Sequence, residues 1–189
     1  MAVQEPRYVL ELHDGPFEVR RYAPRIVAET RITDTSFDAA GNEGFRRLAG
    51  YIFGKNRARQ RVGVAMTAPL RERRDSRKLA MTAPVGERSD SGAWVITFTM
   101  PVGETLATLP LPDDDRVVLR EATTTRVAVY RFSGRWSDAR FTTKTEALRA
   151  WIGTRGMAVV GESEVARYNP PWAPWFLRRN EIWWTLATP

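Results

Sequence analysis

The pentapeptide Ala65-Met66-Thr67-Ala68-Pro69 is repeated as Ala80-Met81-Thr82-Ala83-Pro84, with ten residues between the copies. Each copy lies in a short apolar run with a β-branched threonine, and the charged segment 71–77 separates them, which predicts two strands joined by a polar connection. Because Pro lacks a donor for the strand ladder and extends the residue before it, each copy is expected at an edge or a bulge. Neither copy contains a nucleophile or a phosphate-binding loop, so the repeat indicates architecture before chemistry.

Length and composition predict a single domain over residues 1–189. Hydrophobic residues make up 43% of the chain and aromatic residues 11%, enough for a substantial core. No apolar span is long enough for a membrane helix, and the first residues lack the pattern of a secretory signal, so a cytoplasmic protein is expected. The absence of cysteine excludes disulfides, thiolate catalysis, cysteine-ligated zinc and iron–sulfur clusters.

The chain is strongly basic, with a formal net charge of +7. Such an excess favours acidic partners in general: nucleic acid, anionic lipid, or a small carboxylate or phosphate ligand. The arginines concentrate in segments 57–61 and 71–78, which are predicted to be solvated loops. Neither run contains an aromatic residue for stacking on bases, so nucleic-acid binding is not expected.

A second repeat becomes visible when the sequence is shifted by 100 residues. Val27-Ala28 then aligns with Val127-Ala128, and Asp38-Ala39 aligns with Asp138-Ala139. Each copy has the pattern of a strand, a polar turn and an amphipathic helix. We therefore expect an α+β fold of two similar halves, about residues 17–100 and 116–186, related by a pseudo-two-fold axis. A twisted, mostly antiparallel sheet or open barrel would carry two main helices.

The two helices have identifiable ends. The first is predicted from about Ser36 to Phe53, with Thr35 as its N-cap and Gly54 as its stop. The second is predicted from Ser137 to Ile152, with Ser137 as its own cap. The apolar residues expected to face the sheet are Phe37, Gly41, Phe45, Leu48 and Ile52 in the first helix, and Phe141, Leu148, Trp151 and Ile152 in the second.

Strands are predicted where short apolar or alternating runs are bounded by Gly, Pro or polar turns. Besides the repeated pentapeptide, they are Tyr8–Leu12, Phe17–Tyr22, Ile26–Ile32, Ala93–Met100, Val117–Glu121, Arg126–Phe132, Met157–Tyr168 and Glu181–Leu186.

Four segments, in this order, carry a resemblance to a known family. They are Phe17–Pro24, Gly44–Asn56, the repeated pentapeptides, and Ala166–Trp172 with Arg178–Trp183. Over nearly the whole chain, from about Pro6 to Leu186, the sequence resembles the SOUL family of haem-binding proteins. The resemblance implies two halves that each pack a helix on a twisted antiparallel sheet, similar to the gyrase-inhibitor-like small-molecule-binding domains. It also implies binding of haem or another tetrapyrrole in a shallow apolar groove beside the first helix, without catalysis in most members.

The first helix carries residues suited to such a ligand. Asn42, Arg46, Ala49 and Phe53 form a stripe at helical spacing, with Phe45 beside it. A porphyrin needs a broad apolar face and cations for its two propionates. Phe45 and Phe53 would provide the face, Ala49 the room, and Arg46 a cation. The alternative is an ordinary boundary stripe, half-buried and solvated, and the residues alone leave the two equally supported.

The C-terminal aromatic and proline run offers a second wall. Tyr168 and Trp172 lie in the segment 168–176, where prolines stiffen the chain and order its aromatic rings. This segment would either line the ligand groove or close the open end of the sheet. The following Arg178-Arg179-Asn180-Glu181 is predicted to form a structural ion-pair cluster.

No strong axial iron ligand is evident. Haem iron binds His, Met, Tyr or Cys, and His13, in a predicted surface hairpin, is the only histidine. Relatives that use an axial histidine imply a position occupied here by Arg21, and Gly50 stands where a lysine can occur. Met66 and Met81 could approach the iron, but methionine is more often a core filler. We therefore expect tetrapyrrole binding without a strong axial histidine.

Two other classes of function stay open. One is an enzyme on the same scaffold, degrading haem or hydrolysing a hydrophobic small molecule. A single histidine in a turn and the lack of cysteine give no catalytic set, so no catalytic residue is predicted. The other is a regulatory domain that binds a protein partner.

Overall fold

The computed structural model describes residues 4–33, 35–59, 76–134, 137–169 and 173–187. The two main helices are α1 (Phe37–Ile52) and α2 (Asp138–Thr154), and η1 (Trp175–Leu177) is a single 3₁₀ turn. The strands are β1 (Tyr8–Asp14), β2 (Phe17–Tyr22), β3 (Arg25–Thr33), β4 (Asn56–Arg57), β5 (Val85–Asp90), β6 (Ala93–Thr99), β7 (Leu111–Pro112), β8 (Val118–Ala122), β9 (Thr125–Ser133), β10 (Glu164–Arg167) and β11 (Arg179–Thr185).

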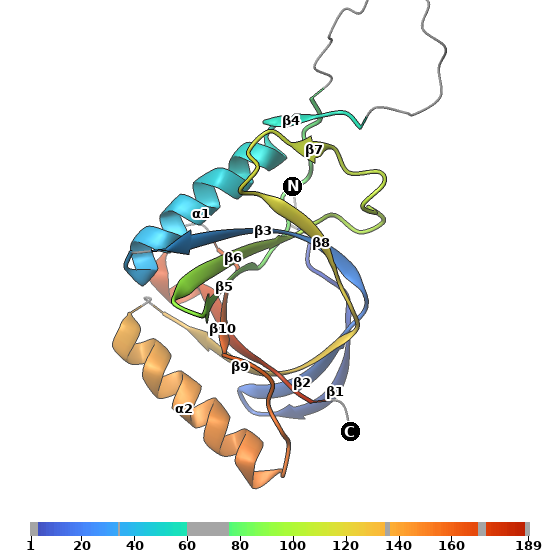
Figure 1. Cartoon of the computed structure of the whole chain (residues 1–189). Helices are drawn as coiled ribbons and strands as arrows, with labels where there is room; N and C mark the ends of the chain where they lie inside the picture. The colour runs from blue at the N-terminus through green and yellow to red at the C-terminus, as the bar shows by residue number, and fades with distance from the viewer. Residues whose placement is uncertain (1–3, 34, 60–75, 135–136, 170–172, 188–189) are drawn as a thin grey trace, which may run out of the picture.

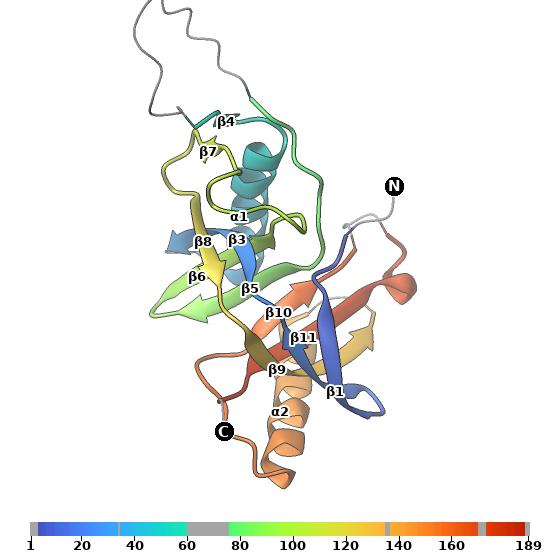
Figure 2. The same ribbon diagram turned by 90° about the vertical axis from the view of Figure 1, so that its right-hand side faces the viewer.

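Nine strands form one curled sheet, and both main helices lie on its outer side (Figures 1 and 2). The order across the sheet is β1-β2-β9-β11-β10-β5-β6-β3-β8, and every pairing is antiparallel. Helix α1 packs on β3 and β6, whereas α2 packs on β9 and β11. The predicted α+β fold with an open antiparallel barrel and two helices is confirmed.

The 100-residue repeat corresponds to two strand–helix units that have exchanged a strand. β3 and α1 recur as β9 and α2 at positions shifted by 100 residues. β2 precedes β3 in the chain but pairs with β9, and β8 precedes β9 but pairs with β3. Between the two units, β5 pairs with β10. The exchange interlocks the two units, because each contributes one strand beside the other's main strand.

Each main helix covers its own apolar cluster. Beneath α1, Leu48 and Ile52 pack with Ile96 and Phe98 of β6. Beneath α2, Leu148, Trp151 and Ile152 pack with Val19 and Ile182. A third cluster contains Tyr22, Val127, Val129, Ala166 and Trp183. The shift by 100 residues also aligns Leu48 with Leu148 and Ile52 with Ile152, and in both units these side chains pack between the helix and the sheet.

Helix α1 approaches the sheet closely at glycines, which have no side chain to separate the two. Gly44 is buried, and a Cβ atom there would lie only 2.4 Å from Cγ1 of Ile96. Gly41, one turn earlier, faces the carboxylate of Glu87 in the same way. Phe45 was predicted to face the sheet, but it is 38% exposed because Gly44 takes the innermost position.

The helix ends follow the capping chemistry with one difference. The Ser137 hydroxyl accepts from the Arg140 N–H at the start of α2, as predicted. At α1 the cap is Ser36, which accepts from the Ala39 N–H, and the prediction of Thr35 was wrong. Ser and Thr are both common at the N-cap, so residue type alone could not distinguish Ser36 from Thr35. α2 continues beyond Gly153 to Thr154, because Gly153 is compatible with helical geometry.

The pentapeptide copies differ from the predicted pair of strands. Residues 65–69 lie outside the described part of the chain. Ala80–Pro84 makes only an isolated bridge, between Thr82 and Gln4, and it leads into β5, which begins at Val85. The Thr82 hydroxyl bonds the Thr99 carbonyl, and the Ala83 N–H donates to the Gln4 carbonyl at 2.8 Å. The strand predicted over Met157–Tyr168 is shorter in the structure: it comprises β10, and Val159 adds an isolated bridge to Leu186.

Candidate functional site

The outer side of α1 borders an open groove of about 620 Å³. Six helix or helix-end residues line it together with one residue that follows the helix: Asn42, Phe45, Arg46, Ala49, Gly50, Phe53 and Lys55. The stripe singled out in the sequence thus borders one surface feature, because its positions recur every three or four residues on one side of the helix.

The groove has an apolar floor. Phe45 is 38% exposed and Phe53 is 57% exposed, whereas Ala49 between them is buried. The Phe45 ring meets the Phe98 ring of β6 edge-on, with centroids 5.5 Å apart, so this ring is held in place by the core. A small side chain at position 49 leaves the space between the two rings open to a flat ligand.

Two cations border the same floor. The Arg46 side chain is largely exposed, and its Nη1 donates to Oε2 of Glu43 at 2.5 Å. The Lys55 side chain lies against Gly50, where a Cβ atom would be 3.1 Å from Cδ of Lys55. The aliphatic part of the Lys55 side chain thus crosses Gly50, and Lys55 belongs to the lining of the groove. Lys55 was missed in the sequence because it follows the helix and lies outside its periodicity.

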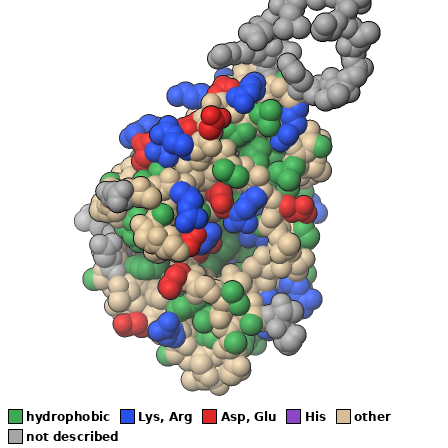
Figure 3. Space-filling model, in the orientation of Figure 1, with side chains coloured by type: hydrophobic (Ala, Val, Ile, Leu, Met, Phe, Trp, Pro, Cys, Tyr) green, Lys and Arg blue, Asp and Glu red, His purple; other side chains and the backbone are tan. Residues whose placement is uncertain are grey.

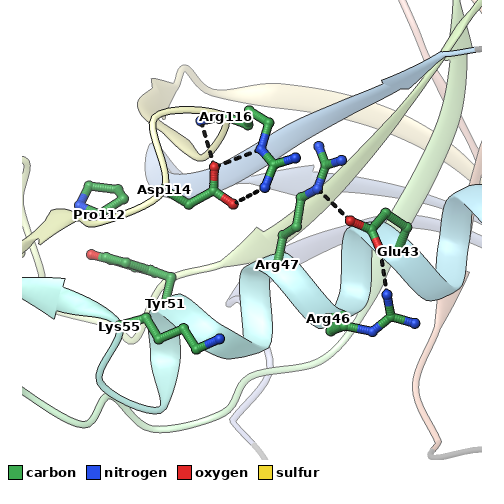
Figure 4. Close-up of a pocket in the computed structure, with 8 residues that line it drawn as sticks. All are labelled: Glu43, Arg46, Arg47, Tyr51, Lys55, Pro112, Asp114 and Arg116. Carbon is green, nitrogen blue, oxygen red and sulfur yellow. Dashed lines mark hydrogen bonds and ion pairs between the residues drawn. The ribbon is translucent and has the colours of Figure 1, made fainter.

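A smaller pocket of about 170 Å³ adjoins the groove on the other side of Arg46 and Lys55 (Figure 4). In it Glu43 accepts from both Arg46 and Arg47, and Arg116 donates to both oxygens of Asp114 at 2.8 and 2.9 Å. The hydrogen bond from Arg47 is the main cause that lowers the pKa of Glu43, so this carboxylate is ionised at neutral pH. In Figure 3, basic and acidic side chains alternate on the surface along α1.

Tyr51 forms the wall between this pocket and the core. Its hydroxyl donates to the Pro110 carbonyl at 3.0 Å, and burial raises its pKa to about 12. The hydroxyl is therefore protonated and directed to the backbone, which makes it a structural group.

Of the three remaining predicted site residues, Tyr168 alone lies in the described part of the chain. Met66 and Trp172 lie outside the described residues. Tyr168 is absent from the groove lining, and its hydroxyl donates to Oε2 of Glu181 at 2.8 Å. The Tyr168 side chain packs against the third apolar cluster. Successive side chains of an extended segment project to opposite faces of a sheet. Arg167 points toward Phe37 of α1, so Tyr168, the next residue, points to the other face.

Glu181 is the centre of a buried polar network. Arg20 donates to both its oxygens, at 2.8 and 3.0 Å, and the Trp183 indole N–H and Arg179 also donate to it. Burial alone would raise the pKa of Glu181, but the hydrogen bonds and the charges of Arg20 and Arg179 outweigh it and lower the pKa. Of the ion-pair cluster predicted at residues 178–181, Arg179 and Glu181 pair with each other, and a further partner of Glu181, Arg20, comes from the distant strand β2.

Donors for iron are scarce around the groove. Among the described residues that line it there is no histidine, methionine or tyrosine. His13 is exposed in the β1–β2 hairpin, as predicted, and borders a different hollow. Arg21 is an exposed residue of β2 that binds Glu11. No cluster of three or more His, Asp or Glu residues suited to a metal ion occurs in the described part of the chain.

None of the helices in the described residues combines the length and the apolar character that crossing a membrane requires.

Solved structures that share this fold have distant sequences. The C-terminal domain of EcmrR superposes with a TM-score of 0.56 at 11% identity, covering 92% of this chain and 98% of that domain. A protein described as a hydrolase from Listeria innocua superposes with a TM-score of 0.54 at 11% identity, covering 89% of this chain and 91% of that one. At such low identity these likenesses establish the fold alone.

Sequence relatives are more informative. Heme-binding protein 1 of Xenopus laevis is 24% identical over 167 residues, which cover 88% of this chain and 82% of that protein. Heme-binding protein 1 of Sus scrofa is 26% identical over 177 residues, covering 92% and 86% respectively. The profile of the family described as SOUL heme-binding protein matches residues 3–185. The chain therefore belongs to the SOUL heme-binding protein family.

Proposed function

We propose that the protein binds haem or a related tetrapyrrole in the groove beside α1, as a carrier, buffer or sensor. The observation that carries this proposal is the pairing of two exposed rings, Phe45 and Phe53, with two cations, Arg46 and Lys55, around one groove. A tetrapyrrole has the matching chemistry, since it combines a flat apolar face with carboxylate arms at its edge. Membership of the SOUL family and the similarity to Heme-binding protein 1 support the same ligand class.

The residues present fit the macrocycle better than they fit the iron. The groove volume of about 620 Å³ lies within the range of small-molecule sites, and its openness suits a ligand that stays partly in water. Because the described lining supplies no axial donor, binding would rest on the apolar face and the carboxylates. Bound haem would add a redox-active iron centre, whereas the role of these residues is to hold and orient the ring.

Titration with hemin and with iron-free protoporphyrin tests this proposal. We expect a saturable shift of the Soret band with both ligands, at similar affinity, because the contacts involve the ring. Phe53→Ser should weaken binding about three- to tenfold. In the parent the ligand would cover part of the exposed Phe53 ring, and the variant loses that apolar contribution to the binding free energy. Val102→Ser, at an equally exposed apolar residue in a loop, is the matched control and should bind normally.

Two results would overturn the proposal. One is the absence of a saturable shift with either porphyrin. The other is a shift that Phe53→Ser leaves unchanged while the variant is as stable as the parent, which would locate the ligand elsewhere.

A further inference from the structure

The turn η1 exposes three large apolar side chains in succession. Trp175 is 48% exposed, Phe176 59% and Leu177 66%. The backbone of the turn is hydrogen-bonded, because the Leu177 N–H donates to the Pro174 carbonyl at 3.0 Å and Nε of Arg178 donates to the Ala173 carbonyl at 2.8 Å. Exposure of an ordered apolar turn costs solvation free energy, so it indicates a contact surface.

Cationic side chains lie beside the turn. Leu177 borders a hollow of about 420 Å³ together with Arg131, Arg178 and Arg179. The carboxylate that borders this hollow, Glu18, is 8% exposed and already binds Nε of Arg20. Arg179 is held by Glu181 and Glu5, whereas Arg131 is an exposed residue of β9. The surface next to the apolar turn is therefore positively charged.

We propose that this surface docks on an anionic lipid membrane. Phe176 and Leu177 enter the interfacial layer, Trp175 lies at the headgroup level, and Arg131 and Arg178 face the lipid phosphates. Aromatic and aliphatic side chains next to cations are what an anionic bilayer surface binds, and the formal charge of +7 draws the protein toward it.

The size of the surface favours a membrane over a protein partner. A stable protein interface buries about 800 Å² on each side and involves some twenty residues. A single turn of three residues offers far less, but a few inserted side chains with nearby cations suffice for reversible membrane binding.

This surface is separate from the groove. The hollow includes residues of the β1–β2 hairpin, which lies at the opposite end of the molecule from β4, next to which Lys55 lies (Figure 2). The proposal therefore does not depend on tetrapyrrole binding, and the protein can use both surfaces at once.

Sedimentation with lipid vesicles tests the proposal on the full chain. We expect binding to phosphatidylcholine vesicles that contain about one-third phosphatidylserine, and little binding to phosphatidylcholine alone. Phe176→Ser combined with Leu177→Ser should weaken binding at least about tenfold. Arg131→Gln should weaken it about fivefold, and salt near 1 M should suppress it by screening.

Phe53→Ser is the matched control. It removes a similarly exposed aromatic side chain at the groove, so it should impair porphyrin binding and leave vesicle binding intact. Conversely, the Phe176/Leu177 double variant should bind porphyrin normally, which also shows that it is folded. Equal sedimentation of the double variant and the parent would overturn the proposal. So would self-association, without vesicle binding, that the same double substitution abolishes, because it would assign the turn to a protein contact.

Discussion

Arg20 and Glu181 are 161 residues apart in the chain and form a fully buried, two-pronged ion pair. Their paired hydrogen bonds, 2.8 and 3.0 Å long, join β2 to β11 across β9. Burial works against the charge of Arg20, but the hydrogen bonds and charge of Glu181 outweigh it and raise the pKa of Arg20. The pair thus fixes how the N-terminal and C-terminal strands meet.

Breaking this pair from one side should be costly. Glu181→Gln or Arg20→Met should each lower the free energy of unfolding by about 3–5 kcal/mol, since each takes from a buried charge its two-pronged partner. The remaining counter-charge is then Glu18 for Arg20, or Arg179 for Glu181. The double variant should lose less than the sum of the two, with a coupling of at least about 1 kcal/mol in urea unfolding. The exposed cross-strand pair Arg31–Asp90 is the control and should couple by less than about 1 kcal/mol. Additive losses at the buried pair would contradict this account.

Glu87 should make stability depend on pH. Burial is the main cause that raises its pKa from the usual 4.5 to about 7; Arg167, 3.4 Å away, opposes this, and Asp38 and Glu164 add to it. A carboxyl whose folded pKa is raised favours the folded state most at low pH. Its contribution is fully present below about 4.5 and is lost as the pH rises through about 7.

Glu87→Gln should remove that dependence. At pH 8 the variant should gain stability relative to the parent, by at most about 3 kcal/mol, and the gain should vanish near pH 4. Unfolding in urea at several pH values measures the difference. Glu146→Gln, an equal charge change on the exposed side of α2, should change stability little across the range. A gain for Glu87→Gln that is constant with pH would show that its charge is not the cause.

Two glycine substitutions should have opposite effects. Gly44→Ala places a Cβ atom 2.4 Å from Ile96 and should cost about 1–3 kcal/mol, because α1 must move away from β6. Gly153→Ala meets no heavy atom within 4 Å and should stabilise α2 by about 0.5–1 kcal/mol. Thermal unfolding compares the two, and equal effects would refute the close contact.

The groove cations should recognise the acid arms of a porphyrin. Lys55→Gln and Arg46→Gln should each weaken binding of mesoporphyrin about two- to fivefold, the range of exposed ion pairs. Neither should affect the dimethyl ester, which keeps the ring and loses both charges. Lys78→Gln, at an exposed lysine outside the groove lining, is the control. Equal losses for acid and ester would assign these residues to packing.

The helical part of the groove could be predicted from the sequence, whereas its second cation could not. Asn42, Phe45, Arg46, Ala49 and Phe53 share one side of a helix by periodicity alone, which local geometry determines. Lys55 reaches the same groove only because the chain turns back at Gly54 and the side chain lies across Gly50. Tyr168 shows the converse: its sequence neighbours suggested the groove, but its place in an extended segment directed it to Glu181.

The sequence by itself determined the two strand–helix units, because patterns repeated at 100 residues encode the same local structure twice. It also determined the helix ends within about two residues and the family to which the chain belongs. Only the tertiary structure decided that the units exchange β2 and β8, and that Arg20 finds Glu181. Pairing between distant strands depends on which surfaces meet once the sheet curls, and no local pattern in the chain carries that information.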